Sequence, residues 1–176
     1  MTGEHTISRT KRSMQSQRFE QALRSSEPGV MPRLSDVDYS VIRDLVPWIA
    51  VIDPDRTSLA LRFVRAGAGI EKLVGREAVG FDYLEFVDPA IKGDAFDSAF
   101  LMLSRPCGLW QITPALLADG STVNVEYTGF PVFDEQRGRG QIMFLIVHTI
   151  ADVGKAPSIH AVRHSTEWHW IELRNV

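Results

Sequence analysis

Three histidines near the C-terminus have the spacing that most resembles a metal site. His160 and His164 stand four positions apart, so one face of a helix would present both imidazoles to a metal ion, and His169 follows them. No cysteine lies nearby to supply a thiolate, and Arg163 stands between the first two histidines. We therefore expect these residues to bind no metal.

The signatures of common catalytic sites are missing from the sequence. It contains no Gly-x-Ser-x-Gly elbow, no His-Glu-x-x-His pair and no Gly-Lys-Ser or Gly-Lys-Thr phosphate loop. Glu126 is the one acid that we expect in the middle of a strand. We expect a non-catalytic protein. The alternative is a small cone-shaped α+β enzyme, in which Glu126 would be the general base.

Two further motifs have ordinary structural interpretations. Gly67-Ala68-Gly69 follows an expected strand, but Lys72 occupies the place of the third glycine of a dinucleotide-binding loop. We interpret this segment as a tight turn from a strand to a helix. Cys107 is the single cysteine, so it excludes an internal disulfide and any multi-cysteine cluster.

Composition indicates a globular chain with no general attraction for polyanions. Of the 176 residues, 44% are hydrophobic and 23% are charged, and the net charge of -3 provides no field that would draw in nucleic acid or anionic lipid. The sequence has neither an apolar run of bilayer length nor a signal-peptide core. We expect a cytoplasmic protein without a membrane or nucleic-acid partner.

Asp119-Gly120 is the strongest turn signal, and we predict that it forms a two-residue type I′ hairpin loop. With that loop, Trp110 would oppose Gly129, and Trp110 and Tyr127 would project from the same face of the sheet. Glu126 would project from the other face, which we expect to be wet. This position disfavours Glu126 as a buried general base.

The neighbouring strands can be ordered from their composition. Pro114 cannot donate a ladder hydrogen bond, so its strand is predicted to lie at an edge of the sheet. The segment 142–147 is apolar at almost every position, so it is predicted to be a central strand with both faces buried.

An amphipathic helix is predicted over 36–46, where Ser35 begins a capping-box pattern. Val37, Val41 and Leu45 fall on one face of that helix. Because the outer face of the central strand needs a cover, we expect this helix to pack there and to form a homodimer with a second copy.

The order of elements and several motifs resemble the PAS family of sensor domains. Ile70, Leu73 and Gly75-Arg76 followed by Gly80 are similar to a recurrent PAS motif, and Asp88-Pro89 resembles the family's usual start of its long helix. Met31-Pro32 and Pro47-Trp48 are similar to a branch of short, stand-alone bacterial PAS proteins.

The resemblance implies an α+β fold: a five-stranded antiparallel sheet of order 2-1-5-4-3, short helices on one face and a flanking N-terminal helix. We expect a mobile arm with one weak helix at 1–33, the PAS-like domain at 34–152, and a tail or output segment at 153–176.

The implied function is sensory signal transduction. A small apolar or aromatic ligand, or a docked signalling protein, would act through the flanking segments. Haem is disfavoured because 90–104 contains no histidine, and flavin is disfavoured because the Asn-Cys-Arg motif of PAS photosensors is absent. The aromatic residues that we expect to line the pocket are Tyr83, Phe86, Phe96, Phe100, Trp110 and Tyr127.

Overall fold

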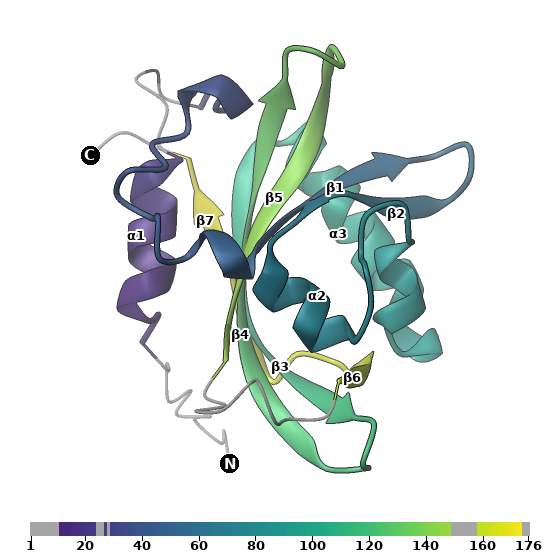
Figure 1. Cartoon of the computed structure of the whole chain (residues 1–176). Helices are drawn as coiled ribbons and strands as arrows, with labels where there is room; N and C mark the ends of the chain where they lie inside the picture. Colours follow the sequence, from purple (N-terminus) through teal and green to yellow (C-terminus); the bar gives the residue numbers. More distant parts are fainter. Residues whose placement is uncertain (1–10, 24–26, 28, 149–157, 174–176) are drawn as a thin grey trace, which may run out of the picture.

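A curled antiparallel sheet organises the computed structural model, which describes residues 11–23, 27, 29–148 and 158–173 (Figure 1). The order β2-β1-β5-β4-β3-β6, with β7 also paired to β3, confirms the α+β class and the predicted order of the first five strands. The strands are β1 Ile49–Asp55, β2 Ala60–Ala66, β3 Cys107–Leu117, β4 Thr122–Asp134, β5 Arg139–His148, β6 Ile159–Val162 and β7 Glu167–Glu172.

The central position predicted for β5 is confirmed, because this strand pairs with β1 on one side and β4 on the other. Its consecutive residues Ile142, Met143, Phe144 and Leu145 are all buried. Met143 and Leu145 belong to the core on one face of the sheet, whereas Ile142 and Phe144 belong to the core on the other.

The prediction that β3 is an edge strand is wrong, because two strands of the C-terminal segment pair with it. β6 pairs with β3 at Ala115, Leu116 and Leu117, and β7 pairs with the stretch from Cys107 to Ile112. Pro114 lies between these two ladders, and its carbonyl accepts a hydrogen bond from the Arg163 amide (2.9 Å). The missing proline N–H therefore falls where neither strand requires it.

The hairpin register is shifted by one residue from the prediction. The loop has three residues, because the amide of Leu117 donates to the Ser121 carbonyl (2.8 Å) and Gly120 adopts a left-handed φ of 86°. Trp110 consequently opposes Thr128 rather than Gly129. A shift of one residue sends side chains to the other face, so Trp110 and Tyr127 point to opposite sides of the sheet.

The outer face of the sheet is covered by α1 (Met14–Ala22), which lies on the side opposite to α2 and α3 (Figure 1). Phe19 is fully buried there, with its ring centroid 5.9 Å from that of Phe130. The face that carries Glu126 was expected to be wet, but it is buried, and Trp110 lies on it as well. The weak helix assigned to a mobile arm therefore covers part of the outer face of the sheet.

The helix predicted over 36–46 is not formed. Short 3₁₀ turns η1 (Leu34–Asp36) and η2 (Val46–Trp48) flank irregular turns. The Asp38 carboxylate accepts hydrogen bonds from the amide and hydroxyl of Ser40, a local arrangement that competes with a helix. Val37 and Leu45 are buried in the core of the chain, and only Val41 of the proposed dimer contacts is exposed (41%).

Short helices cover the inner face, as predicted. They are α2 (Ala68–Val74), η3 (Tyr83–Phe86), η4 (Pro89–Ile91) and α3 (Lys92–Ser104). The Asp88 carboxylate caps the turn that leads into α3 by accepting from the Ala90 amide (2.9 Å). In the described part of the chain, no helix is long and apolar enough to cross a bilayer.

Candidate ligand-binding cavity

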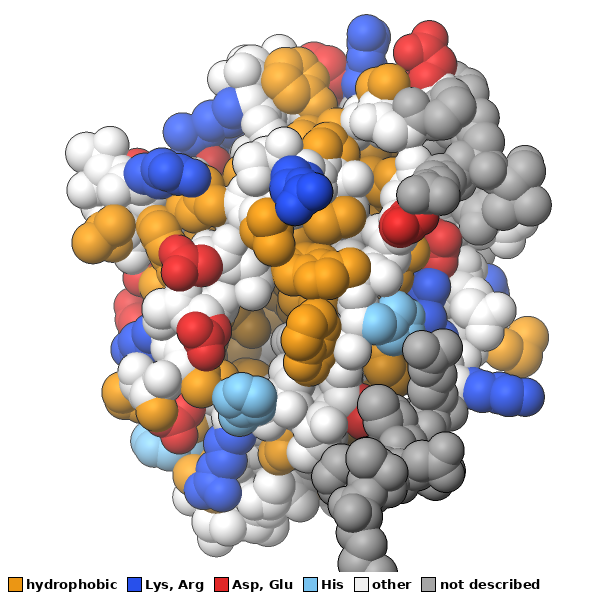
Figure 2. Space-filling view, turned by 180° about the vertical axis from the view of Figure 1, so that it is seen from behind, with side chains coloured by type: hydrophobic (Ala, Val, Ile, Leu, Met, Phe, Trp, Pro, Cys, Tyr) orange, Lys and Arg blue, Asp and Glu red, His pale blue; other side chains and the backbone are white. Residues whose placement is uncertain are grey.

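A cavity of about 560 Å³ lies between α3 and the inner face of the sheet, and the C-terminal strands β6 and β7 form one of its walls. Its volume falls within the range of about 300–1,000 Å³ that is usual for small-molecule sites. On the face of the molecule opposite to the view of Figure 1, hydrophobic side chains gather along the centre and the surface is hollowed beside them (Figure 2). Apolar residues from the sheet and the helices form most of the wall: Ile52, Leu61, Val87, Ile91, Ala95, Ala99, Leu101, Met102, Leu109, Ile142 and Val162.

Tyr83 and Tyr127 bring two phenol groups to the cavity wall. The ring of Tyr127 stacks on Phe144 with a centroid distance of 5.0 Å, and the ring of Tyr83 lies 5.8 Å from the same phenylalanine. The apolar surroundings raise the pKa of Tyr83 to about 12 and hold the pKa of Tyr127 well above its usual range. Both groups therefore remain protonated near neutral pH and can donate hydrogen bonds.

Charged side chains stand at the rim of the cavity. Asp94 and Asp97 come from α3, and Arg163 and His164 come from the segment that joins β6 to β7. All four are exposed to solvent. The interior is thus apolar apart from a few neutral donors and acceptors, and charge is confined to its edge.

The structure brings together only part of the predicted site. Tyr83 and Tyr127 line the cavity, but Phe86, Phe96 and Phe100 do not. Phe86 packs edge-on against Phe63 in the inner core, and the rings of Phe96 and Phe100 contact each other at 4.8 Å.

The prediction that Trp110 lines the pocket is wrong, because the one-residue register shift puts its side chain under α1 on the other face. Trp168 and Trp170 of β7 and Gln111 of β3 line the cavity, although they were not among the predicted site residues. The two tryptophans alternate with His169 and Ile171, which is the pattern of a strand with two different faces. This alternation is the sequence feature from which the position of the two tryptophans on one face of a strand could have been predicted.

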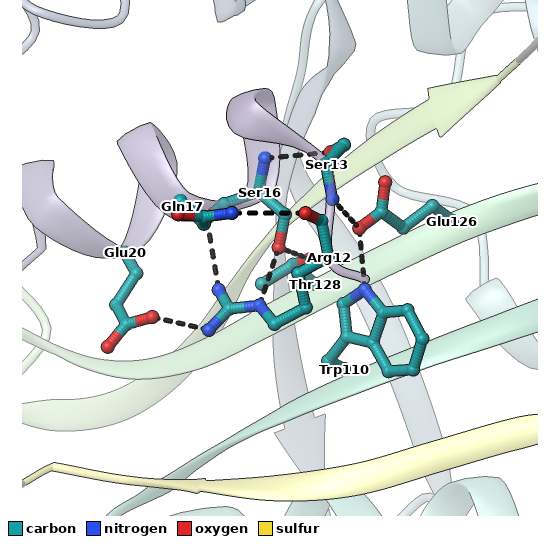
Figure 3. A network of polar contacts seen from close by, with 8 residues as sticks. All are labelled: Arg12, Ser13, Ser16, Gln17, Glu20, Trp110, Glu126 and Thr128. Carbon is teal, nitrogen blue, oxygen red and sulfur yellow. Dashed lines mark hydrogen bonds and ion pairs between the residues drawn. The ribbon is translucent and has the colours of Figure 1, made fainter. Parts of the chain in front are cut away.

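Behind the cavity, a buried polar network attaches α1 to the sheet (Figure 3). Glu126 Oε1 accepts hydrogen bonds from the indole Nε1 of Trp110 (2.5 Å) and from the Ser13 amide (3.0 Å). The hydroxyls of Ser16 and Thr128 hydrogen-bond each other at 2.6 Å. Ser16 and Thr128 are almost completely buried, so the contact between α1 and the sheet is partly polar in its interior.

Arg12 extends this network along α1. Its guanidinium donates to the Ser16 hydroxyl (3.0 Å) and forms an ion pair with Glu20 (2.5 Å; Figure 3). The side chains of both charged residues are mostly shielded from solvent. Charge-assisted contacts of this kind fix geometry more strictly than apolar packing does.

The cavity and the network share two strands. In β4, Tyr127 faces the cavity and the preceding Glu126 faces α1, whereas in β3 Gln111 faces the cavity and the preceding Trp110 faces α1. Gln111 and Tyr127 are paired across the ladder. The same two strands therefore form part of the cavity wall and hold α1.

The described residues contain no group of three or more histidine, cysteine or acidic side chains that could hold a metal. His160 lies in strand β6 and His164 in the irregular segment that follows it, so they do not share the face of a helix. Partial burial raises the pKa of the Cys107 thiol above its usual value, which disfavours a reactive thiolate.

No family model matches the sequence, and a search of curated proteins finds no match. Solved structures with a similar arrangement include VqmA bound to DPO, with 17% sequence identity and a TM-score of 0.48, and the likeness covers 65% of this chain and 57% of that one. The chain thus spans little more than half the length of VqmA.

Two further structures are of domains that this chain covers almost completely. One is a light-oxygen-voltage domain, with 18% identity, a TM-score of 0.46, and coverage of 67% of this chain and 90% of that one. The other is the PAS domain of a protein from Colwellia psychrerythraea, with 13% identity, a TM-score of 0.44, and coverage of 62% and 93%. The fold is PAS-like in its strand order β2-β1-β5-β4-β3, which is the order that the sequence predicts.

Proposed function

We propose that this chain is a non-catalytic sensory module that binds a small apolar or aromatic molecule in the cavity and signals through α1. The observation that carries the proposal is the cavity of about 560 Å³ whose β3–β4 wall backs directly onto the polar attachment of α1. A ligand that favours one arrangement of this wall shifts the population of docked and released α1.

The polar attachment is suited to such a response. A buried donor or acceptor that loses its partner costs about 1–3 kcal/mol, and this cost depends steeply on geometry. Small movements of Glu126 and Thr128 therefore change the stability of the docked helix more than equal movements of an apolar contact would.

The alternative of a cone-fold enzyme with a buried carboxylate base is less well supported. The acids that line the cavity, Asp94 and Asp97, are exposed. Glu126 is buried, but it lies on the face of the sheet opposite to the cavity, and its carboxylate already accepts hydrogen bonds from Trp110 and Ser13. An enzyme would show a bell-shaped pH profile that is lost on replacing one carboxylate.

Homodimerisation, and the docking of a signalling partner, remain proposals. The reason for expecting a dimer was an uncovered outer face, and α1 now covers part of that face. Val37 and Leu45 are buried, so Val41→Glu is the substitution that tests a contact through this segment without opening the core. Membership of the stand-alone bacterial branch and a cytoplasmic location also remain predictions.

The proposal is tested by native mass spectrometry of the full chain purified without denaturant. We expect a retained small molecule, or a melting temperature that rises with small aromatic compounds. Ser98→Trp on the cavity side of α3 should abolish either effect, whereas Ser104→Trp, which lies at the end of the same helix and outside the cavity wall, should preserve it. Ligand binding that is unchanged in the Ser98 variant would contradict the proposal.

A further inference from the structure

Strand β7 adds a tryptophan wall to the cavity. Trp168 and Trp170 pair with Gln111 and Leu109 of β3, so both indoles lie on the cavity face of the sheet. Their rings are 6.1 Å apart with an angle of 75° between the planes. Trp168 is 56% exposed, more than any other Trp, Tyr or Phe side chain in the described residues. A large aromatic surface is therefore open to a ring that enters the cavity.

The amide of Gln111 is oriented beside this wall. The Ser165 hydroxyl donates to Gln111 Oε1 (2.9 Å) and is itself within hydrogen-bond distance of the Thr113 hydroxyl (3.3 Å). With the amide oxygen occupied by Ser165, the Nε2 group is the part of Gln111 that is available to donate to a ligand. Tyr127, paired with Gln111 across the ladder, offers a phenolic O–H as a second donor.

We propose that the tryptophan wall and the Gln111 amide form a subsite for an uncharged planar aromatic compound that carries a hydrogen-bond acceptor. The indoles supply stacking surface, and the Gln111 and Tyr127 donors select for the acceptor. Asp94, Asp97, Arg163 and His164 are confined to the rim of the cavity, so the apolar interior, which offers no charged partner among the described residues, favours an uncharged compound. This inference rests on the proposed function, because it names the class of ligand that the same cavity takes.

Quinoline and naphthalene are matched probes for this subsite, since they share shape and size and differ in one ring nitrogen that accepts a hydrogen bond. Titration of the ¹⁵N-labelled full chain should shift the indole N–H signals of Trp168 and Trp170. Quinoline should bind about fivefold more tightly than naphthalene, as expected for one additional hydrogen bond.

Two variants separate the contributions. Gln111→Leu should remove most of the preference for quinoline and leave the affinity for naphthalene almost unchanged. Trp168→Leu should weaken both probes by about fivefold. Phe133→Leu, which replaces an exposed aromatic outside the cavity wall, should change neither affinity. Because Trp168 is exposed, its replacement should preserve the fold, which circular dichroism will verify.

Equal affinities for the two probes in the wild-type chain would overturn the inference, as would a preference that survives in the Gln111 variant. Binding that is insensitive to Trp168→Leu, or no binding of either probe, would also overturn it. The proposed function would then be decided separately by the Ser98→Trp comparison, because that experiment does not depend on the class of ligand.

Discussion

The indole Nε1 of Trp110 donates a hydrogen bond of 2.5 Å to Glu126 Oε1, and the same carboxylate oxygen accepts from the Ser13 amide at the start of α1. One buried oxygen thus joins β3, β4 and the helix that covers them.

Glu126→Ala should destabilise the chain by about 2 kcal/mol, because it leaves the Trp110 indole and the Ser13 amide without their shared acceptor. Urea denaturation measures the loss, and hydrogen exchange should show reduced protection of α1. The control is Glu77→Ala at an exposed position, which should change stability by less than about 0.5 kcal/mol. Equal effects of the two substitutions would show that the network contributes nothing.

Ser16 and Thr128 should be energetically coupled, because their hydroxyls satisfy each other in a buried contact. Ser16→Ala and Thr128→Val should each cost about 1 kcal/mol, and the double variant should cost about 1 kcal/mol less than the sum of the two. Chemical denaturation of the four proteins completes the cycle. Strict additivity would argue against the hydrogen bond.

Gly120→Ala should destabilise the hairpin by about 1 kcal/mol, because Gly120 has a φ of 86°, although the space around it is open. Gly93→Ala is the matched control, since that glycine lies in α3 with open space and an ordinary φ. Its replacement should leave the melting temperature unchanged or raise it. The opposite order of melting temperatures would contradict the strain that we assign to a side chain at Gly120.

Stability should fall as the pH rises from about 10 to about 12, partly because of Tyr83. In the unfolded chain this phenol ionises near pH 10, whereas in the folded chain its pKa is about 12, so the unfolded state releases the proton first. The contribution is fully present below pH 10 and is lost as the pH approaches 12. Thermal melts at pH 8 and pH 11 measure how much stability each protein loses between the two pH values. Tyr83→Phe should reduce this loss by about 1–2 kcal/mol. Equal losses in the variant and the wild-type chain would contradict a role for the raised pKa of Tyr83.

Some of the fold could be predicted because the relevant signals are local. The continuous apolar run around Phe144 requires burial on both sides, which places β5 in the middle of any sheet. Asp88-Pro89 similarly marks the turn that leads into α3. Neither feature depends on knowing which distant segment packs against it.

The wrong predictions for the hairpin and for α1 arise because a local sequence pattern does not determine which distant groups come into contact. Asp119-Gly120 suits both a two-residue and a three-residue loop, and the choice between them sets the direction of every side chain in the hairpin. α1 looked weak because its apolar stripe is short, and part of its attachment comes from Ser16 bonded to Thr128, 112 positions away. Periodicity cannot reveal a polar contact across that separation.

The position of Pro114 has a consequence for how the C-terminal segment can come apart. This residue lies between the two ladders, so β6 and β7 pair with β3 over separate stretches of its outer side. The loss of the ladder that holds the two tryptophans would therefore break no hydrogen bond of the ladder that holds Ile159.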